Sequence, residues 1–212
     1  MSSDTNLITV SQYRLGDIVL LNLNEETVFN DILTQFPNSI GSKFILEKKN
    51  NNKSDNIDLI TKIVMENLEQ NKHLLPKNIT ESTVIHLRLG DVVAGNAGHE
   101  RVKRPLKIDH LKTLVANDNN PKYVIGKCFF AETSSKNYEE CINKSNEYLQ
   151  NVINELQAEH FNSGDADIDL YCAVMSKKYI QGRGFYSRLI SEIRQKLNLD
   201  SIIIEAENPI MD

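Results

Sequence analysis

A basic residue, a glycine and an acid directly follow an apolar run at residues 83–91, Thr-Val-Ile-His-Leu-Arg-Leu-Gly-Asp. Val84 and Ile85 favour a strand, so Arg88 is expected at its carboxyl end, where open α/β sheets bind their ligands. An arginine guanidinium is permanently charged, and its planar fork fits phosphate oxygens. Gly90 allows a sharp turn and a close approach of a ligand to the backbone. The stretch therefore predicts an anion site, best suited to a diphosphate.

Two further residues of this stretch could take part. His86 precedes Arg88 by two positions, so both side chains are expected on one face of the strand. The histidine could hydrogen-bond a nucleotide or orient Arg88, and it could equally be a core residue with a partner of its own. Asp91 is expected to hold the following loop by bonding backbone N–H groups.

A second glycine-bearing stretch at residues 182–187 is expected to be a loop that opens a helix. Free N–H groups at a helix start, together with glycine-rich backbone, form an anion-binding nest. Ser187 could add a hydroxyl to a phosphate oxygen, and Arg183 could add a second positive charge. The predicted contact set of this loop is Gly182, Arg183, Gly184, Phe185, Tyr186 and Ser187.

Together the two stretches resemble the fucosyltransferase superfamily with the GT-B fold, which includes protein O-fucosyltransferases and α-1,2 and α-1,6 fucosyltransferases. The His-x-Arg-x-Gly-Asp spacing is similar to the pyrophosphate motif of those families, and residues 167–190 are similar to their second block. The resemblance implies that Arg88 contacts the donor diphosphate and that Asp169 recognises the base. A carboxylate can accept two hydrogen bonds from guanine. Arg183 and Tyr186 are bulkier than the residues usual in this loop.

The acids near Asp169 leave alternatives open. Asp165 and Asp167 compete with it for the base, and Asp169 could instead cap the next helix. Asp165 and Asp167 also resemble the Asp-x-Asp metal signature of GT-A glycosyltransferases, although a turn and not an apolar strand precedes them. The histidines lack the spacing of paired metal ligands, so no metal site is expected. Walker, dinucleotide and Gly-x-Ser-x-Gly motifs are absent.

Composition limits the function classes. The chain has 212 residues, 40% of them hydrophobic, which suffices for one α/β domain, or for one domain with a smaller second domain. A net charge of -5 disfavours nucleic-acid binding. No apolar run reaches the roughly 20 residues of a membrane span. The first residues lack the features of a signal peptide, and the three cysteines form no Cys-x-x-Cys pair, so a cytoplasmic protein with reduced thiols is expected.

Strands and helices alternate from residue 83, which predicts a Rossmann-like, mostly parallel sheet with helices on both faces. Strands are expected at 83–87, 122–130, 179–180 and 201–205, and helices at 109–117, 138–159, 170–176 and 187–197. Before them, strands at 19–23 and 43–47 and helices at 26–36 and 55–70, the latter capped by Ser54, predict a small α/β region. We therefore divide the chain into a small N-terminal α/β region, 1–78, and a nucleotide-sugar-binding domain, 79–212.

The leading hypothesis is a metal-independent, inverting glycosyltransferase of glycan biosynthesis that needs no cofactor. It would move a sugar, with fucose as the best guess, from a GDP-linked donor to a hydroxyl of a glycan, protein or small molecule. Arg88 would stabilise the departing diphosphate, and Glu132 and His99 are candidates for the general base. Because residues 1–78 are short for an acceptor domain, a non-catalytic nucleotide-sugar-binding module is one alternative. A GT-A enzyme using Asp165 and Asp167 is another.

Overall fold

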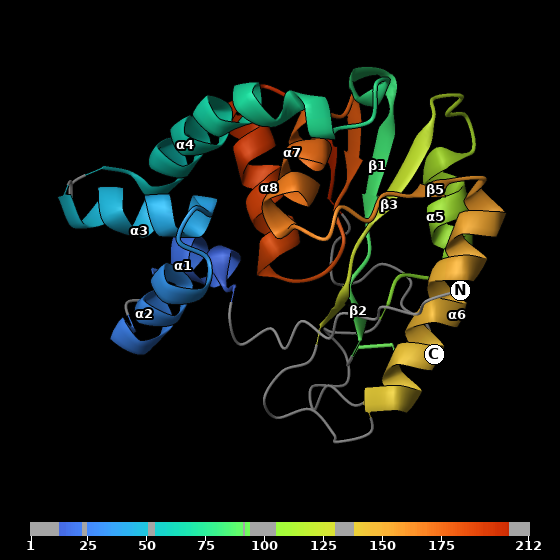
Figure 1. Cartoon of the computed structure of the whole chain (residues 1–212). Coiled ribbons are helices and arrows are strands. Elements are labelled where there is room, and N and C mark those ends of the chain that lie inside the picture. Colours follow the sequence, from blue (N-terminus) through green and yellow to red (C-terminus); the bar gives the residue numbers. More distant parts are fainter. Residues whose placement is uncertain are drawn as a thin grey trace.

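A five-stranded parallel sheet lies at the centre of the computed structural model, which describes residues 13–22, 25–50, 54–90, 92–93, 105–129 and 138–203. The sheet order is β5-β3-β1-β6-β7 (Figure 1). Numbered along the chain, this is 3-2-1-4-5, the order of a doubly wound Rossmann sheet. The strands are β1 (Thr83–His86), β3 (Lys122–Ile125), β5 (Glu159–His160), β6 (Lys178–Ile180) and β7 (Ser201–Ile202).

A short second ladder continues two of these strands beyond the main sheet. It pairs β2 (Leu89–Gly90) with β4 (Cys128–Phe129), again in parallel. The single strand expected over 122–130 is therefore two strands, separated at Gly126. A Cβ at Gly126 would stand 2.2 Å from the carbonyl oxygen of Leu87, and its φ is +149°, so the close approach of the two chains requires glycine there.

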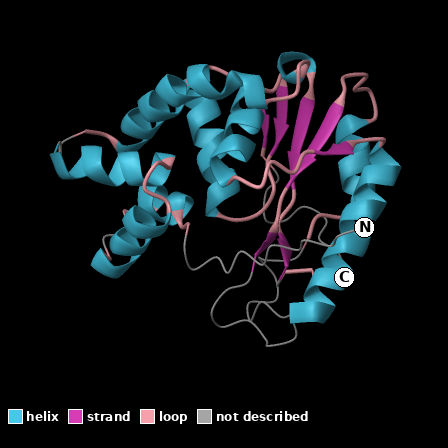
Figure 2. Ribbon diagram, viewed as in Figure 1, coloured by secondary structure: helices cyan, strands magenta, loops and turns pink. Residues whose placement is uncertain are grey.

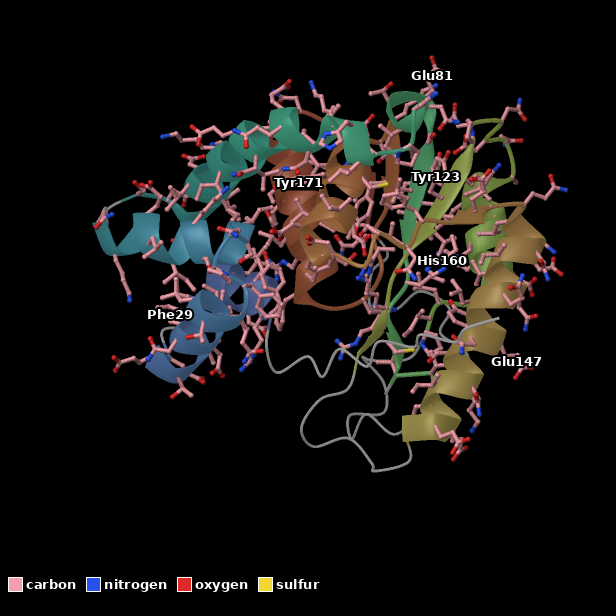
Figure 3. All side chains as sticks on the ribbon, viewed as in Figure 1. Phe29, Glu81, Tyr123, Glu147, His160 and Tyr171 are labelled. Atoms are coloured by element: carbon pink, nitrogen blue, oxygen red, sulfur yellow. The ribbon has the colours of Figure 1, made fainter. Side chains whose placement is uncertain are left out.

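Helices cover both faces of the sheet, as predicted (Figure 2). On one face lie α5 (Ile108–Val115) and α6 (Tyr138–Leu156), and on the other α7 (Ala166–Met175) and α8 (Phe185–Lys196). Alternate strand residues serve the two faces, because successive side chains of a strand point in opposite directions. Ile85 thus packs with α5 and α6, while Val84 packs with α7 and α8. Figure 3 shows Tyr171 of α7 and Glu147 of α6 on opposite sides of the sheet.

The described part of residues 13–78 contains helices and no strand. These are α1 (Leu15–Leu20), α2 (Glu26–Gln35), α3 (Ile40–Asn50) and α4 (Asn56–Asn71), followed by the 3₁₀ turns η1 (Lys72–Leu74) and η2 (Ile79–Glu81). The strands expected at 19–23 and 43–47 are therefore wrong, and with them the α/β character of this region. In α1, Leu15, Ile18 and Val19 are buried while Leu21 just beyond it is 53% exposed. That spacing is helical.

The N-terminal helices form an additional layer outside α7 and α8 (Figure 1). A Cβ at Gly16 would stand 2.4 Å from the backbone carbon of Phe185, so α1 rests directly on the first residues of α8. One apolar core joins these helices to the sheet. The division at residue 78 stays a prediction.

The remaining expectations are mostly confirmed. The strands β1, β6 and β7 and the helices α2 and α4 to α8 lie where the sequence placed them, within a few residues. The short polar strand β5 was not expected, and Asp55 rather than Ser54 caps α4 by accepting from two N–H groups. No described helix is both long enough and apolar enough to cross a membrane. Asp91, His99 and Glu132 lie outside the described residues.

Candidate functional site

Arg88 and the 182–187 loop meet at the carboxyl edge of the sheet. Chain connections leave the neighbouring strands β1 and β6 toward opposite sides, which makes the space beyond their ends the switch point where such sheets bind ligands. Arg88 follows β1, and the loop follows β6. The guanidinium Nη1 of Arg88 lies 3.0 Å from where a Cβ on Gly184 would stand. The two predicted halves of the anion site are therefore side by side.

Gly184 is the N-cap residue of α8 and has a φ of 94°, which favours glycine. Gly184 has no side chain with which to cap the helix, and no described side chain takes that place. The first N–H groups of a helix have no partner within the helix and carry the positive end of its dipole. The structure thus places a permanent cation and a helix start without a side-chain cap at one point, and both favour an anion.

His86 packs directly against Gly182. A Cβ at Gly182 would stand 2.2 Å from the His86 carbonyl oxygen and 2.5 Å from its Nδ1, so this contact also requires glycine. The histidine is 8% exposed, and its Nδ1 has no hydrogen-bond partner among the described residues. Burial, and then the charge of Arg88, lower the pKa of His86 to about 3, so the ring is neutral at physiological pH. A neutral imidazole can donate or accept one hydrogen bond there.

Asp169 lies in the first turn of α7, a helix that also starts at the carboxyl edge. It is 5% exposed and accepts a hydrogen bond of 2.6 Å from the Ser163 hydroxyl. Burial raises its pKa to about 6, opposed by Ser163 and by the charge of Lys127. Asp169 is therefore a largely desolvated carboxyl group in the first turn of a helix that starts at this edge.

The other two acids have structural partners. Asp165 is the N-cap of α7 and accepts from the backbone N–H of Asp167 at 2.8 Å. Asp167 accepts from the Tyr13 hydroxyl and, at 2.7 Å, from the N–H of Ile40. Asp167 thus links the N-terminal helices to α7, and the helix cap that Asp169 could have supplied comes from Asp165. The described residues contain no group of three or more side chains suited to hold a metal ion.

Several residues that were predicted to contact the ligand instead form hydrogen bonds inside the domain. The Ser187 hydroxyl is fully buried, 2.7 Å from the Tyr179 hydroxyl, and the Tyr186 hydroxyl donates to the Ala166 carbonyl oxygen. Gly90 has a φ of 89°, and its N–H donates to the buried Ser145 hydroxyl at 2.8 Å. Neither hydroxyl of the α8 start is directed to the edge in this structure.

Two further side chains of the loop are at least partly accessible. Phe185 is 39% exposed and offers an aromatic surface beside Gly184. Arg183 is half-buried, and burial lowers the pKa of its guanidinium.

Lys127 is a residue that the sequence did not single out. It follows β3, so it reaches the same carboxyl edge one strand away from Arg88. The signal was present: Gly126-Lys127 follows the apolar Tyr123-Val124-Ile125 much as Arg88 follows its own apolar run. It was hidden because 122–130 was expected to be one continuous strand.

The sheet order and its polar carboxyl edge define the class of the fold, a Rossmann-type α/β domain. No family model matches the chain, and no curated protein matches it. Solved structures of POFUT1 do match. POFUT1 in complex with GDP has a TM-score of 0.41 and 13% identity over 71% of this chain and 50% of that chain. POFUT1 in complex with GDP-fucose has a TM-score of 0.39 and 15% identity over 86% and 59%.

The chain thus spans roughly half the length of the POFUT1 structures it matches.

Proposed function

We propose that this chain is a glycosyltransferase whose nucleotide-sugar donor places its diphosphate between Arg88 and the start of α8. The observation that supports this most is the 3.0 Å approach of Arg88 Nη1 to the Cβ position of Gly184 at the switch point. A guanidinium and a helix start without a side-chain cap together compensate two linked negative charges better than either does alone.

In the proposed reaction the bond between the sugar and the phosphate breaks, and its electron pair leaves with the diphosphate. The acceptor hydroxyl oxygen bonds to the sugar carbon from the opposite side, which inverts that centre, and its proton passes to a general base. Arg88 stabilises the charge that grows on the leaving group, so it binds the transition state more tightly than the ground state. We assign the compensation of this charge to protein groups, without a metal ion or cofactor. The candidate bases Glu132 and His99 lie outside the described residues.

The GDP and fucose parts of the proposal come from the resemblance of the His-x-Arg-x-Gly-Asp motif to fucosyltransferases. The placement of Asp169 supports the base assignment, because a buried carboxylate rewards a ligand that donates two hydrogen bonds, as guanine does. The exposed ring of Phe185 could stack on the base or the sugar. The acceptor is a hydroxyl on a glycan, protein or small molecule.

A second candidate function is nucleotide-sugar binding without catalysis. It is favoured by the described part of residues 13–78, which consists of helices packed outside α7 and α8. A GT-B enzyme places its acceptor on a second Rossmann-like domain across a cleft, and the described residues hold one such sheet.

The test is release of GDP from GDP-fucose by the purified chain, with and without candidate acceptors. Arg88→Met should lower turnover by about 10²–10³-fold, the usual effect of removing one charge-stabilising donor. Arg188→Met is the matched control, because Arg188 lies on α8 and its side chain is 58% exposed. Turnover of Arg88→Met near the wild-type rate would overturn the proposal.

Two further measurements separate the alternatives. Thermal shifts with GDP, UDP and ADP identify the base, since a ligand that binds only the folded state raises its stability. A GDP response without any turnover would favour the binding module. Turnover that EDTA abolishes would favour the metal-dependent alternative with Asp165 and Asp167.

A further inference from the structure

The Nζ atom of Lys127 is fully buried and has no hydrogen-bond partner among the described residues. An ammonium group has three donors and no acceptor, and a charge that is removed from water without a partner is costly. The charge of Lys127 acts on Asp169, whose pKa it helps to lower, but the described contacts include no ion pair between them. Within the described part of the chain, the hydrogen-bonding capacity of this cation is therefore unused.

Lys127 also lies beside Arg88 in the chain order of the two strands. His86 pairs with Ile125 in the main sheet and Leu89 pairs with Cys128 in the short ladder, so Arg88 and Lys127 hold corresponding positions in the stretch between the two ladders. Neighbouring strands lie about 4.8 Å apart. Like charges directly opposite each other destabilise a sheet.

The two side chains belong to the same face of the sheet. Ile125 packs with α7 and α8, and Lys127 follows it by two positions, while Arg88 reaches Gly184 at the start of α8. Nδ1 of His86, on β1, is also buried without a hydrogen-bond partner among the described residues. Unused polar groups from two neighbouring strands thus gather at one edge.

We propose that Lys127 is a second phosphate-binding residue, which with Arg88 forms a two-cation cradle for a diphosphate. This rests on the proposed function and adds a residue to its site. An anion between the two side chains replaces their repulsion by two attractions and supplies the acceptor that Nζ lacks. During transfer the leaving diphosphate gains one negative charge, and a second fixed cation stabilises that gain.

A phosphate-binding role of Lys127 can be distinguished experimentally from a role in binding the nucleotide base. If Lys127 contacted the base, its loss would weaken the binding of guanosine and GDP alike. In the cradle it contacts phosphoryl oxygens, so its loss weakens pyrophosphate and GDP and spares guanosine. The repulsion between the two cations favours the phosphate, because only an anion relieves it.

The experiment measures binding of inorganic pyrophosphate, GDP and guanosine to the full chain by calorimetry. Lys127→Met should weaken pyrophosphate and GDP about 10–100-fold, as expected for a lost charged hydrogen bond, and change guanosine less than about twofold. The melting temperature without ligand should stay the same or rise, because an unpartnered cation has been removed. Lys127→Arg should restore most of the binding. Lys122→Met, at the other end of β3, is the control and should bind like the wild type.

Pyrophosphate binding by Lys127→Met within about twofold of the wild type would overturn the cradle, as would a wild-type chain that binds no pyrophosphate. If Lys127→Met does not fold, Lys127→Gln decides by the same criteria. The proposed function fails separately. If pyrophosphate binding depends on Lys127 but GDP-fucose is not turned over, the two-cation cradle is supported and the proposed enzymatic function is contradicted. If turnover depends on Arg88 but not on Lys127, the enzymatic function is supported and the cradle is contradicted.

Discussion

Each of the two edges of the sheet contains a buried cation, but the two cations differ in their hydrogen bonding. At the amino edge, Arg194 near the end of α8 is 0% exposed. Its Nη1 donates to the carbonyl oxygens of Ala173, Val174 and Ser176 at 2.8–2.9 Å, and its Nη2 donates to that of Asp200 at 2.5 Å. At the carboxyl edge, Lys127 Nζ is buried without a hydrogen-bond partner in the described part of the chain.

The comparison separates a structural cation from a candidate binding cation. The last carbonyl groups of a helix have no partner within it, and α7 ends against Arg194, which satisfies them. Helix α8 begins at the other edge, where no described side chain caps its start and Arg88 reaches Gly184, while α1 packs on Phe185. In the proposed function this start of α8 binds the ligand.

The largest effect is expected at the closed edge. Arg194→Met leaves several buried carbonyl oxygens without donors and should lower the free energy of unfolding by about 3–5 kcal/mol. Urea denaturation measures this, with Arg188→Met as the exposed control that should change it by less than about 0.5 kcal/mol. If Arg194→Met lowers the free energy of unfolding by less than about 1 kcal/mol, Arg194 is not the structural cation that distinguishes the amino edge from the carboxyl edge.

The sequence predicted the Rossmann-type part well, since its buried strands are short apolar runs that can be read without knowing their neighbours. It failed at 19–23 and 43–47 because the apolar residues there lie close together, and the helical spacing appears only when Leu15 and Ile40 are included. The strand β5 was not predicted because it is short, polar and exposed, as the outermost strand of the sheet.

For the site, the sequence placed Arg88, His86 and the glycine loop at one edge, and the structure brings them together. It could not foresee that the Ser187 and Tyr186 hydroxyls turn inward, because that depends on Tyr179 and Ala166, which approach only in the folded chain. Lys127 was missed because 122–130 was expected to be one continuous strand, whereas β3 ends at Ile125. Its position beside Arg88 follows from the register between β1 and β3, which composition does not reveal.

A smaller effect is expected at the open edge, from Gly184→Ala. A side chain there meets both a φ of 94° and the Arg88 guanidinium at 3.0 Å. The strain should cost about 1–3 kcal/mol of stability, and displaced Arg88 should weaken pyrophosphate binding about tenfold. Gly164→Ala is the matched control, because Gly164 has a φ of +80° and open space around its Cβ position. It should show the strain alone, so equal binding losses in both variants would contradict a role for the Arg88 contact.

Asp169→Asn should instead stabilise the apo protein modestly. The pKa of Asp169 is raised to about 6 in the folded state, so the charged form costs stability as the pH rises from its unfolded pKa, near 4, through 6. The variant should therefore match the wild type near pH 4 and exceed it by about 1–2 kcal/mol near pH 8. It should also lose preference for GDP over ADP. Asp109→Asn, at an exposed position of α5, is the control. An Asp169→Asn variant that is less stable than the wild type near pH 8 would show that Asp169 is a structural group like Arg194.

The smallest effect concerns the bond that holds the N-terminal helices to the open edge. Tyr13→Phe removes the hydroxyl that donates to Asp167 and should cost about 1 kcal/mol near neutral pH. The same hydrogen bond lowers the pKa of Asp167, which burial raises to about 6, so the pKa should rise further in the variant. A protonated carboxyl group needs this donor less, and the loss should therefore shrink near pH 4. Tyr123→Phe removes a 2.7 Å bond to Asn78 at the amino edge, where the partner does not titrate, so its cost should be the same at both pH values. A Tyr13→Phe cost that also ignores pH would mean that the ionised Asp167 does not hold these helices in place.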